Sequence, residues 1–186
     1  MTLQSKKKIR IEDFYVVDSD EGLIISTRGG NGERFFMLSS RAWAMLVKKI
    51  HDSFSTGADT IFFEMGQHYG AALAHQVKKY GLDYKQGIET LLERTAVVGW
   101  GKIIVSGNFE SGEDIRVKVD NCVFCEDRKG TTSKPSCYFF RGIVSGMSQS
   151  LYQTSFRTVE RLCVASGGPY CEFILEPDKF SVESIN

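Results

Sequence analysis

Five cysteines and one glutamate in the second half of the chain are residues of the types that bind soft metal ions. They are Cys122, Cys125, Cys137, Glu160, Cys163 and Cys171. Thiolate is a favoured ligand of tetrahedral zinc, and a carboxylate can supply a fourth position. An odd number of cysteines fits a disulfide framework poorly, so the sequence favours metal or thiol chemistry over disulfides.

One candidate set consists of Cys137, Glu160, Cys163 and Cys171. Cys163 and Cys171 flank the turn 166–169, so a hairpin can bring them together. Cys137 is expected in the first turn of a helix, where the helix dipole favours a thiolate. In a regular strand Glu160 and Cys163 point to opposite faces, so both reach one metal only if the strand bends, bulges or ends between them. Spacing alone leaves buried free cysteines as the alternative.

Cys122 and Cys125 form a second candidate, because a two-residue gap suits a zinc-binding turn. Here the pair falls at the end of a segment, 115–125, whose apolar residues alternate as in a half-buried strand. Positions three apart on a strand face opposite ways. We therefore interpret Cys122 and Cys125 as core or edge residues, with metal or redox chemistry as the alternative.

The elements that must position these residues follow from hydrophobic periodicity. Helices are expected over about 39–54, 59–80, 83–98 and 135–152, and strands over 14–17, 22–27, 34–38, 102–109, 115–125, 156–165 and 170–175. This order predicts an α+β fold, with an antiparallel sheet of about four strands packed with helices and an N-terminal strand arm. We expect a disordered tail over 1–10, the arm over 11–38, the main domain over 39–176 and a C-terminal tail over 177–186.

Composition excludes several classes of function. The 23 basic and 23 acidic residues give a formal net charge of zero, which removes the simplest argument for nucleic-acid binding. No apolar run is long enough to span a membrane, and no secretory signal is evident. We expect a cytoplasmic protein.

Several motifs resemble the 4-vinyl reductase domain, also called the hydrocarbon-binding domain. They are CYFFRG at 137–142 with Gly146, ERLC at 160–163, GPYCEF at 168–173, ADTIFFEMG at 58–66 with Gly70, and GWG at 99–101. The resemblance covers roughly residues 20–176. It implies a fold shared with trafficking-complex subunits of the TRAPP type, which are usually dimeric.

The resemblance also implies a structural zinc ion. The zinc-binding members include sensory domains of phenol- and toluene-responsive regulators, in which the metal lies beside a pocket for a small aromatic effector. The resemblance makes Cys137, Glu160, Cys163 and Cys171 the expected zinc ligands. Those sensors hold the effector hydroxyl with a histidine and a tryptophan. The histidines and tryptophans of this chain match those two positions only loosely.

A ligand pocket is expected between the helices 59–80 and 135–152. Its candidate lining residues are Phe62, Met65, Gly66, Tyr69, Trp100, Phe140, Val144 and Met147. The alternative is that these residues only pack the two helices together and line no ligand pocket. The functional interpretation is an apolar cavity with a few polar groups.

The sequence therefore predicts a zinc-binding domain that binds or senses a small hydrophobic or aromatic ligand. No catalytic residues are identified. A role in transcription regulation would require a partner protein, because no ATPase module or DNA-binding helix pair is recognisable. A homodimer formed through the arm and the first helix is expected. The alternatives are an accessory enzyme or carrier in tetrapyrrole metabolism, and a structural assembly subunit without ligand.

Overall fold

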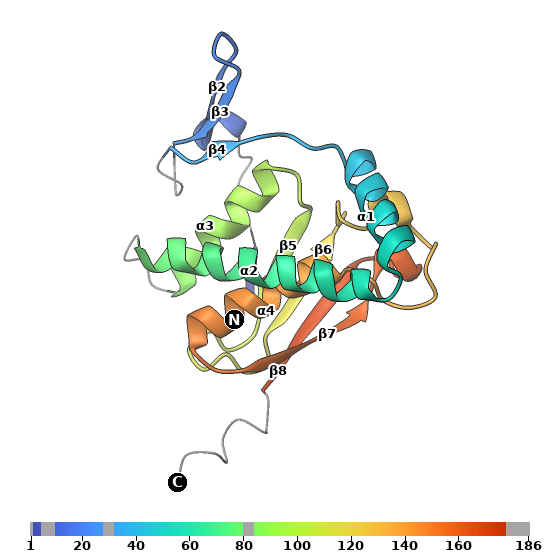
Figure 1. Ribbon diagram of the computed structural model, residues 1–186. Helices are drawn as coiled ribbons and strands as arrows, with labels where there is room; N and C mark the ends of the chain where they lie inside the picture. Colours follow the sequence, from blue (N-terminus) through green and yellow to red (C-terminus); the bar gives the residue numbers. More distant parts are fainter. Residues whose placement is uncertain (1, 5–9, 28–31, 80–83, 178–186) are drawn as a thin grey trace.

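The computed structural model describes residues 2–4, 10–27, 32–79 and 84–177. Its main body is a five-stranded antiparallel sheet, and helices α2 and α4 cross one face of that sheet (Figure 1). A separate three-stranded arm projects from the body. The expected α+β architecture is confirmed.

The large sheet has the strand order β1-β5-β6-β8-β7. Its strands are β1 (Thr2–Gln4), β5 (Lys102–Ser106), β6 (Arg116–Asp120), β7 (Phe156–Leu162) and β8 (Cys171–Pro177). The expectation of a disordered tail over 1–10 is wrong for β1, because Leu3 is buried and pairs with Val105 on β5. A three-residue strand carries too little periodicity to be recognised in sequence. Residues 5–9 and 178–186 of the two expected tails lie outside the described part.

The helices are α1 (Ser40–Phe54), α2 (Gly57–Lys79), α3 (Tyr84–Val97) and α4 (Tyr138–Tyr152). Their bounds lie close to the expected ones. Ser39 caps α1, because its side chain accepts a hydrogen bond from the Ala42 N–H at 3.2 Å. None of the helices in the described ranges is long and apolar enough to cross a membrane.

Glycines let α2 and α4 pack with their backbones in contact. A Cβ atom at Gly66 would lie 2.0 Å from the carbonyl oxygen of Phe139, and one at Gly146 would lie 1.9 Å from that of Gln67. Gly66 and Gly146 therefore serve helix packing. This contact holds α4 firmly over the sheet, with its N-terminal end fixed in position.

The arm consists of β2 (Tyr15–Asp18), β3 (Leu23–Ser26) and β4 (Arg34–Phe35). A buried arginine of α3 ties it to the body. Arg94 donates hydrogen bonds to Glu33 Oε2 at 2.7 Å, to Gln76 Oε1 at 3.1 Å and to the Tyr15 hydroxyl at 3.3 Å. The arm thereby covers one end of a groove that continues towards α1.

Candidate metal centre and ligand cavity

Cys122 and Cys125 lie on a tight turn, not on a strand. The strand β6 ends at Asp120, and Asn121 follows with a φ of 54°. The Cys125 N–H donates to the Cys122 carbonyl at 3.0 Å, which closes the turn. The expected strand over 115–125 is therefore too long by several residues, and the argument that the two thiols face opposite ways does not hold.

Cys137 occupies the N-terminal capping position of α4. Its backbone N–H donates to Glu160 Oε2 at 3.0 Å. A carboxylate at this position is favoured by the positive end of the helix dipole. The contact fixes Glu160 of β7 against the start of α4, so one end of the helix and one strand of the sheet meet at this point.

The strand β7 resolves the difficulty of bringing Glu160 and Cys163 together. The pairing of β7 with β8 shifts register between Glu160 and Leu162, and β7 ends at Leu162. Cys163 then begins a short turn, and its carbonyl accepts the Gly168 N–H at 2.8 Å. The Val164 N–H donates to the sulfur of Cys171 at 3.4 Å. The bulge and the turn direct Glu160, Cys163 and Cys171 to one site.

The six side chains converge in two overlapping groups. The Sγ atoms of one group all lie within 4.8 Å of one another, as do the ligand atoms of the other. The first group is Cys122, Cys125, Cys137 and Cys171, and the second is Glu160, Cys163 and Cys171. The Cys122 and Cys137 sulfurs are 3.9 Å apart, and those of Cys125 and Cys163 are 3.8 Å apart.

These distances suit metal coordination. A disulfide needs sulfurs about 2.05 Å apart, and all five thiols are free. Two thiolates that bind one tetrahedral zinc at about 2.3 Å lie about 3.8 Å apart. The site is also dry, because the cysteines are at most 2% exposed and Glu160 is 8% exposed.

Glu160 gives an independent indication of a ligand. Its Oε1 atom is buried and has no hydrogen-bond partner among the described residues. An unpaired buried carboxylate oxygen is costly unless a cation or donor completes it. A metal ion bound by this oxygen and the neighbouring thiolates would remove that cost, so the donor set fits zinc.

Burial and mutual hydrogen bonding shift the proton affinities in the cluster. Burial raises the pKa of Glu160 to about 7, against the opposing effects of the nearby Cys163 thiol and of the hydrogen bond from the Cys137 N–H. Hydrogen bonds from Cys122, and then from Cys137 and Cys163, lower the pKa of Cys125 to about 5. The pKa of Cys137 rises, chiefly through its hydrogen bonds with Cys122 and Cys125. The raised pKa values mean that most of these groups keep their protons in the metal-free protein, and a bound cation would displace those protons.

An apolar cavity of about 90 Å³ lies between α3, α4 and the sheet. Among the expected pocket residues, four line this cavity: Trp100, Phe140, Val144 and Met147. Its polar lining atoms are largely engaged, because the Ser148 hydroxyl donates to the Val144 carbonyl at 2.7 Å and the Thr95 hydroxyl donates to the Leu92 carbonyl at 3.1 Å. The cavity therefore suits a small apolar molecule.

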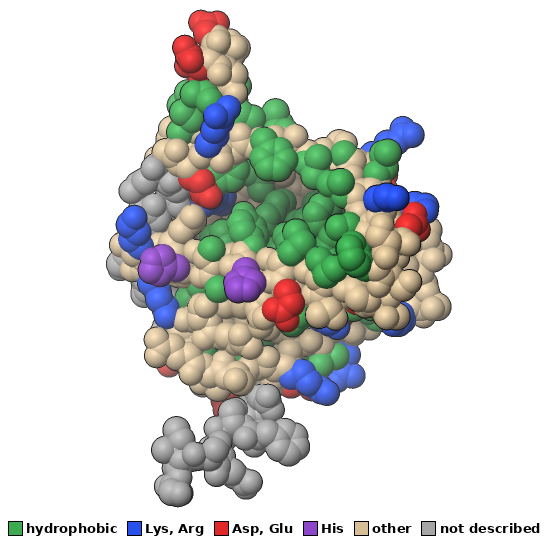
Figure 2. All heavy atoms as spheres, in the orientation of Figure 1, with side chains coloured by type: hydrophobic (Ala, Val, Ile, Leu, Met, Phe, Trp, Pro, Cys, Tyr) green, Lys and Arg blue, Asp and Glu red, His purple; other side chains and the backbone are tan. Residues whose placement is uncertain are grey.

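A larger open groove of about 660 Å³ runs between the arm and the body. Figure 2 shows hydrophobic side chains gathered in this hollow above α2. Tyr69 and Trp100 line it, and Trp43 contributes an indole Nε1 that has no partner within the described part of the chain. Trp100 lines both spaces, so the groove and the apolar cavity adjoin at this residue.

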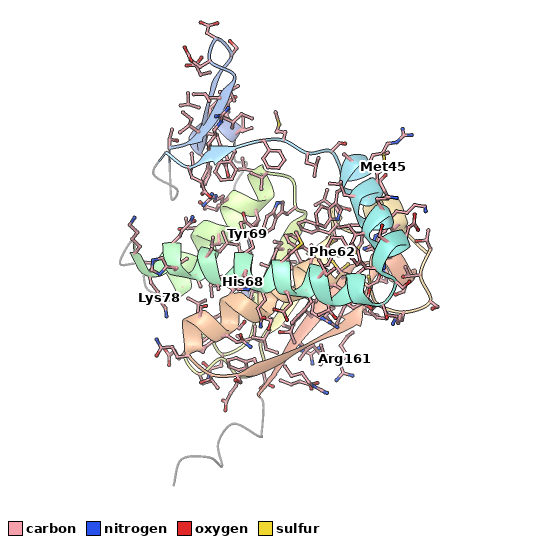
Figure 3. The ribbon with its side chains drawn as sticks, viewed as in Figure 1. Met45, Phe62, His68, Tyr69, Lys78 and Arg161 are labelled. Carbon is pink, nitrogen blue, oxygen red and sulfur yellow. The ribbon has the colours of Figure 1, made fainter. Side chains whose placement is uncertain are left out.

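The remaining expected pocket residues lie elsewhere. Phe62 packs against Trp43 beside α1, with ring centroids 5.7 Å apart (Figure 3). Met65 is 49% exposed, and Gly66 is buried in the contact with α4. His68 of α2 is exposed, so it does not supply the polar anchor of a buried pocket.

Phe124 links the metal centre to both spaces. It lies within the turn between Cys122 and Cys125, and its ring meets Trp100 edge to face at 5.3 Å and Trp43 at 5.6 Å. Phe140 continues the contact to Phe173, two residues after Cys171, with ring centroids 5.2 Å apart. The aromatic side chains thus form a continuous path from cavity to cysteines.

A sheet covered by helices thus holds a buried cysteine-rich cluster beside an apolar cavity. Residues 115–177 match the family model of the 4-vinyl reductase domain, which confirms the resemblance for that segment. The matched segment contains all six candidate metal ligands and the whole of α4.

Two uncharacterized proteins of Methanocaldococcus jannaschii are similar in sequence. MJ0745 is 33% identical over 67 residues, which span 36% of each chain. MJ0855 is 23% identical over 175 residues, which span 91% of this chain and 67% of the relative. The first similarity thus concerns about a third of that relative's length, and neither relative supplies a function.

Three solved structures share the fold. The phenol-responsive sensory domain of the transcription activator PoxR, with phenol, has a TM-score of 0.74 at 20% identity and covers 90% of this chain and 86% of its own. A vinyl-4-reductase family protein from Methanocaldococcus jannaschii has a TM-score of 0.54 at 18% identity. The match covers 77% of this chain and 84% of that one. A trafficking protein particle complex subunit 3 from Naegleria fowleri has a TM-score of 0.53 at 12% identity. The match covers 75% of this chain and 93% of that one.

Proposed function

We propose that this protein is a zinc-stabilised domain that binds a small aromatic or apolar ligand and acts as a sensor. The observation that carries the proposal is the aromatic path from the apolar cavity at Trp100 to the cysteine turn at Phe124. The fold similarity to the phenol-responsive domain of PoxR supports the same function.

Zinc is proposed as the metal because thiolate-rich tetrahedral sites favour it. The family resemblance implies Cys137, Glu160, Cys163 and Cys171 as the ligands. The ligand atoms of Glu160, Cys163 and Cys171 lie within 4.8 Å of one another, whereas Cys137 groups with Cys171 and the other two cysteines. The unpaired Glu160 oxygen supports a metal at this site. With only protein ligands the ion has no open position for a substrate, so its role is structural. Because the thiols must lose protons to bind it, metal binding also contributes folding free energy.

The cavity indicates the size and polarity of the ligand. Its volume of about 90 Å³ is somewhat below the roughly 150 Å³ of a dry apolar cavity known to accept benzene, so one aromatic ring fits after small side-chain movements. Ser148 and Thr95 use their hydroxyl hydrogens on backbone carbonyls, which leaves only their oxygens to accept a bond. A phenol that donates its hydroxyl hydrogen matches this arrangement.

A homodimer would place the exposed apolar residues of the arm connection and α1 in an interface. Phe36 is 81% exposed, Met37 77%, Met45 66% and Leu46 53%. A regulatory role would further require a partner protein that recognises the ligand-bound form. The cavity and groove favour ligand binding over a purely structural assembly role.

Isothermal titration of the zinc-loaded protein with phenol, toluene and cyclohexanol tests the ligand proposal. We expect saturable binding of phenol and toluene at one site per chain, and weaker binding of cyclohexanol, whose puckered ring is thicker. Absence of binding by all three, with the protein folded and loaded with metal, would contradict the proposal. Retention of a coloured tetrapyrrole on purification would instead favour the carrier alternative.

A further inference from the structure

The cluster holds more metal-binding atoms than one zinc ion uses. A tetrahedral ion takes four ligands. Here five sulfur atoms and one carboxylate converge, and each belongs to a residue that is at least nine-tenths buried. Two of the sulfurs, those of Cys122 and Cys125, lie outside the ligand set that the family resemblance implies.

The turn that carries Cys122 and Cys125 presents both sulfurs to the same site. Cys122 Sγ lies 3.9 Å from Cys137, and Cys125 Sγ lies 3.8 Å from Cys163. Each pair has the separation expected of two thiolates on one tetrahedral zinc. Buried cysteines that act only as small hydrophobes have no reason to place their sulfurs together at this spacing.

The two groups of ligand atoms share members. Cys171 belongs both to the group with Cys122, Cys125 and Cys137 and to the group with Glu160 and Cys163. Cys125 belongs to the first group and contacts Cys163 of the second. Cys125 and Cys171 therefore lie where the two groups meet.

We propose that the cluster binds two zinc ions, bridged by the thiolates of Cys125 and Cys171. Cys122 and Cys137 complete the first tetrahedron, and Glu160 and Cys163 complete the second. Four terminal ligands and two bridging ligands fill the eight positions of two tetrahedral ions. This inference rests on the proposed function as a zinc-binding domain, and it assigns Cys122 and Cys125 a role in metal binding.

Charge balance permits two ions. Five thiolates and one carboxylate carry six negative charges, which two divalent cations reduce to a net charge of minus two. That is the charge of one zinc with four thiolates, a common structural site.

The experiment counts zinc per chain in the full-length protein, purified under reducing conditions and equilibrated with zinc. Elemental analysis and native mass spectrometry should both give two ions. Cys122→Ser and Cys163→Ser each remove a terminal ligand of one ion, so each should retain one zinc. Cys125→Ser and Cys171→Ser remove a bridge and should retain fewer than one. Thr131→Ala is the control. Thr131 lies in the exposed loop between Cys125 and Cys137, so this variant should retain two zinc ions.

The wild-type chain provides a test that does not depend on folding of the variants. Blocking its thiols with a mercurial should release two zinc ions, counted with a colorimetric chelator, and cobalt titration should saturate at two equivalents. If the wild type binds one zinc ion, and Cys122→Ser keeps it while Cys163→Ser loses it, the two-ion proposal is overturned and the proposed function stands. One zinc lost only in Cys122→Ser would overturn it and change the ligand set. Iron with acid-labile sulfide, or no metal, would overturn both proposals.

Discussion

The rings of Trp100 and Phe124 meet edge to face, with centroids 5.3 Å apart and an angle of 73° between their planes. Trp100 lines the apolar cavity, while Phe124 lies in the turn between two cysteines of the metal cluster. A ligand that moves the Trp100 ring must therefore also displace the Phe124 ring, because the two rings are in contact. Under the proposed function, this contact is a direct physical route from the ligand cavity to the metal site.

Phe124→Leu should weaken that route while sparing the metal. Leucine keeps an apolar side chain but removes the ring contacts, at a cost of about 1–2 kcal/mol in the free energy of unfolding. In the cobalt-substituted wild type we expect phenol to shift the visible absorption, and in Phe124→Leu we expect a much smaller shift. Phe54→Leu, at an exposed position of α1, is the control. An equal shift in Phe124→Leu would show that this contact carries no signal.

Val144→Phe should fill the cavity from α4. Val144 is 8% exposed and lines the space of about 90 Å³, so a larger ring occupies the volume that a ligand needs. We expect phenol affinity to fall at least about tenfold, or 1.4 kcal/mol, in isothermal titration. His75→Phe, on the exposed side of α2, adds a ring without touching the cavity and should bind phenol normally. Unchanged affinity in Val144→Phe would place the ligand elsewhere.

Two glycines of α2 should respond in opposite ways to alanine. At Gly66 a Cβ would lie 2.0 Å from the Phe139 carbonyl oxygen, so Gly66→Ala must push α4 away and should cost at least about 3 kcal/mol. At Gly57 the nearest atom to a Cβ is Phe54 Cβ at 3.9 Å, so Gly57→Ala should stabilise the helix by about 0.5 kcal/mol. Urea unfolding measures both, and similar stabilities would refute the close contact between α2 and α4.

In the metal-free, reduced protein, the contribution of Glu160 to stability should fall as the pH rises from 4.5 to 7. The lowered pKa of Cys125, about 5, acts in the opposite direction above pH 5, so the contribution of Glu160 is read by comparison with a variant. Burial raises the pKa of Glu160 from 4.5 to about 7. In that window the unfolded chain has released the Glu160 proton while the folded chain still holds it, so folding becomes less favourable, by about 3 kcal/mol at most. Urea unfolding at several pH values should show this slope in the difference between the wild type and Glu160→Gln. The same slope in both proteins would assign it to other groups.

The arm connection and α1 should mediate dimerisation. Phe36 and Met37 are 81% and 77% exposed, which is unusual for adjacent large apolar residues. Replacing both with aspartate should convert a dimer into a monomer in analytical ultracentrifugation without loss of bound metal. A wild-type chain that is already monomeric at high concentration would exclude this interface.

The sequence predicted the helices well because their apolar periodicity is strong, as in α4 with Phe140, Val144 and Leu151 buried. It also predicted that Glu160 and Cys163 reach one site only if their strand is interrupted between them, and the bulge after Glu160 provides the interruption. Both results depend on local pattern and on the geometry of strands.

The convergence of Cys122 and Cys125 on the other cysteines was not predicted, because apolar alternation continued past Asp120 and concealed the end of β6. The two-residue gap of the pair, with Asn121 just before it, was the available signal of a turn, because asparagine tolerates the positive φ that it adopts here. The pocket was only partly predicted. Helical spacing identifies a face of α2, but only the packing of α2 on α4 decides that Gly66 is covered and Met65 exposed.

Elemental analysis combined with native mass spectrometry of the purified protein tests the central claim most directly, because it reports bound metal, oligomer size and any retained small molecule together. A zinc-binding cluster predicts stoichiometric zinc on every folded chain, two ions if Cys125 and Cys171 act as bridges. Less than about half a zinc per chain, with no uptake of metal after reduction of the thiols, would contradict it.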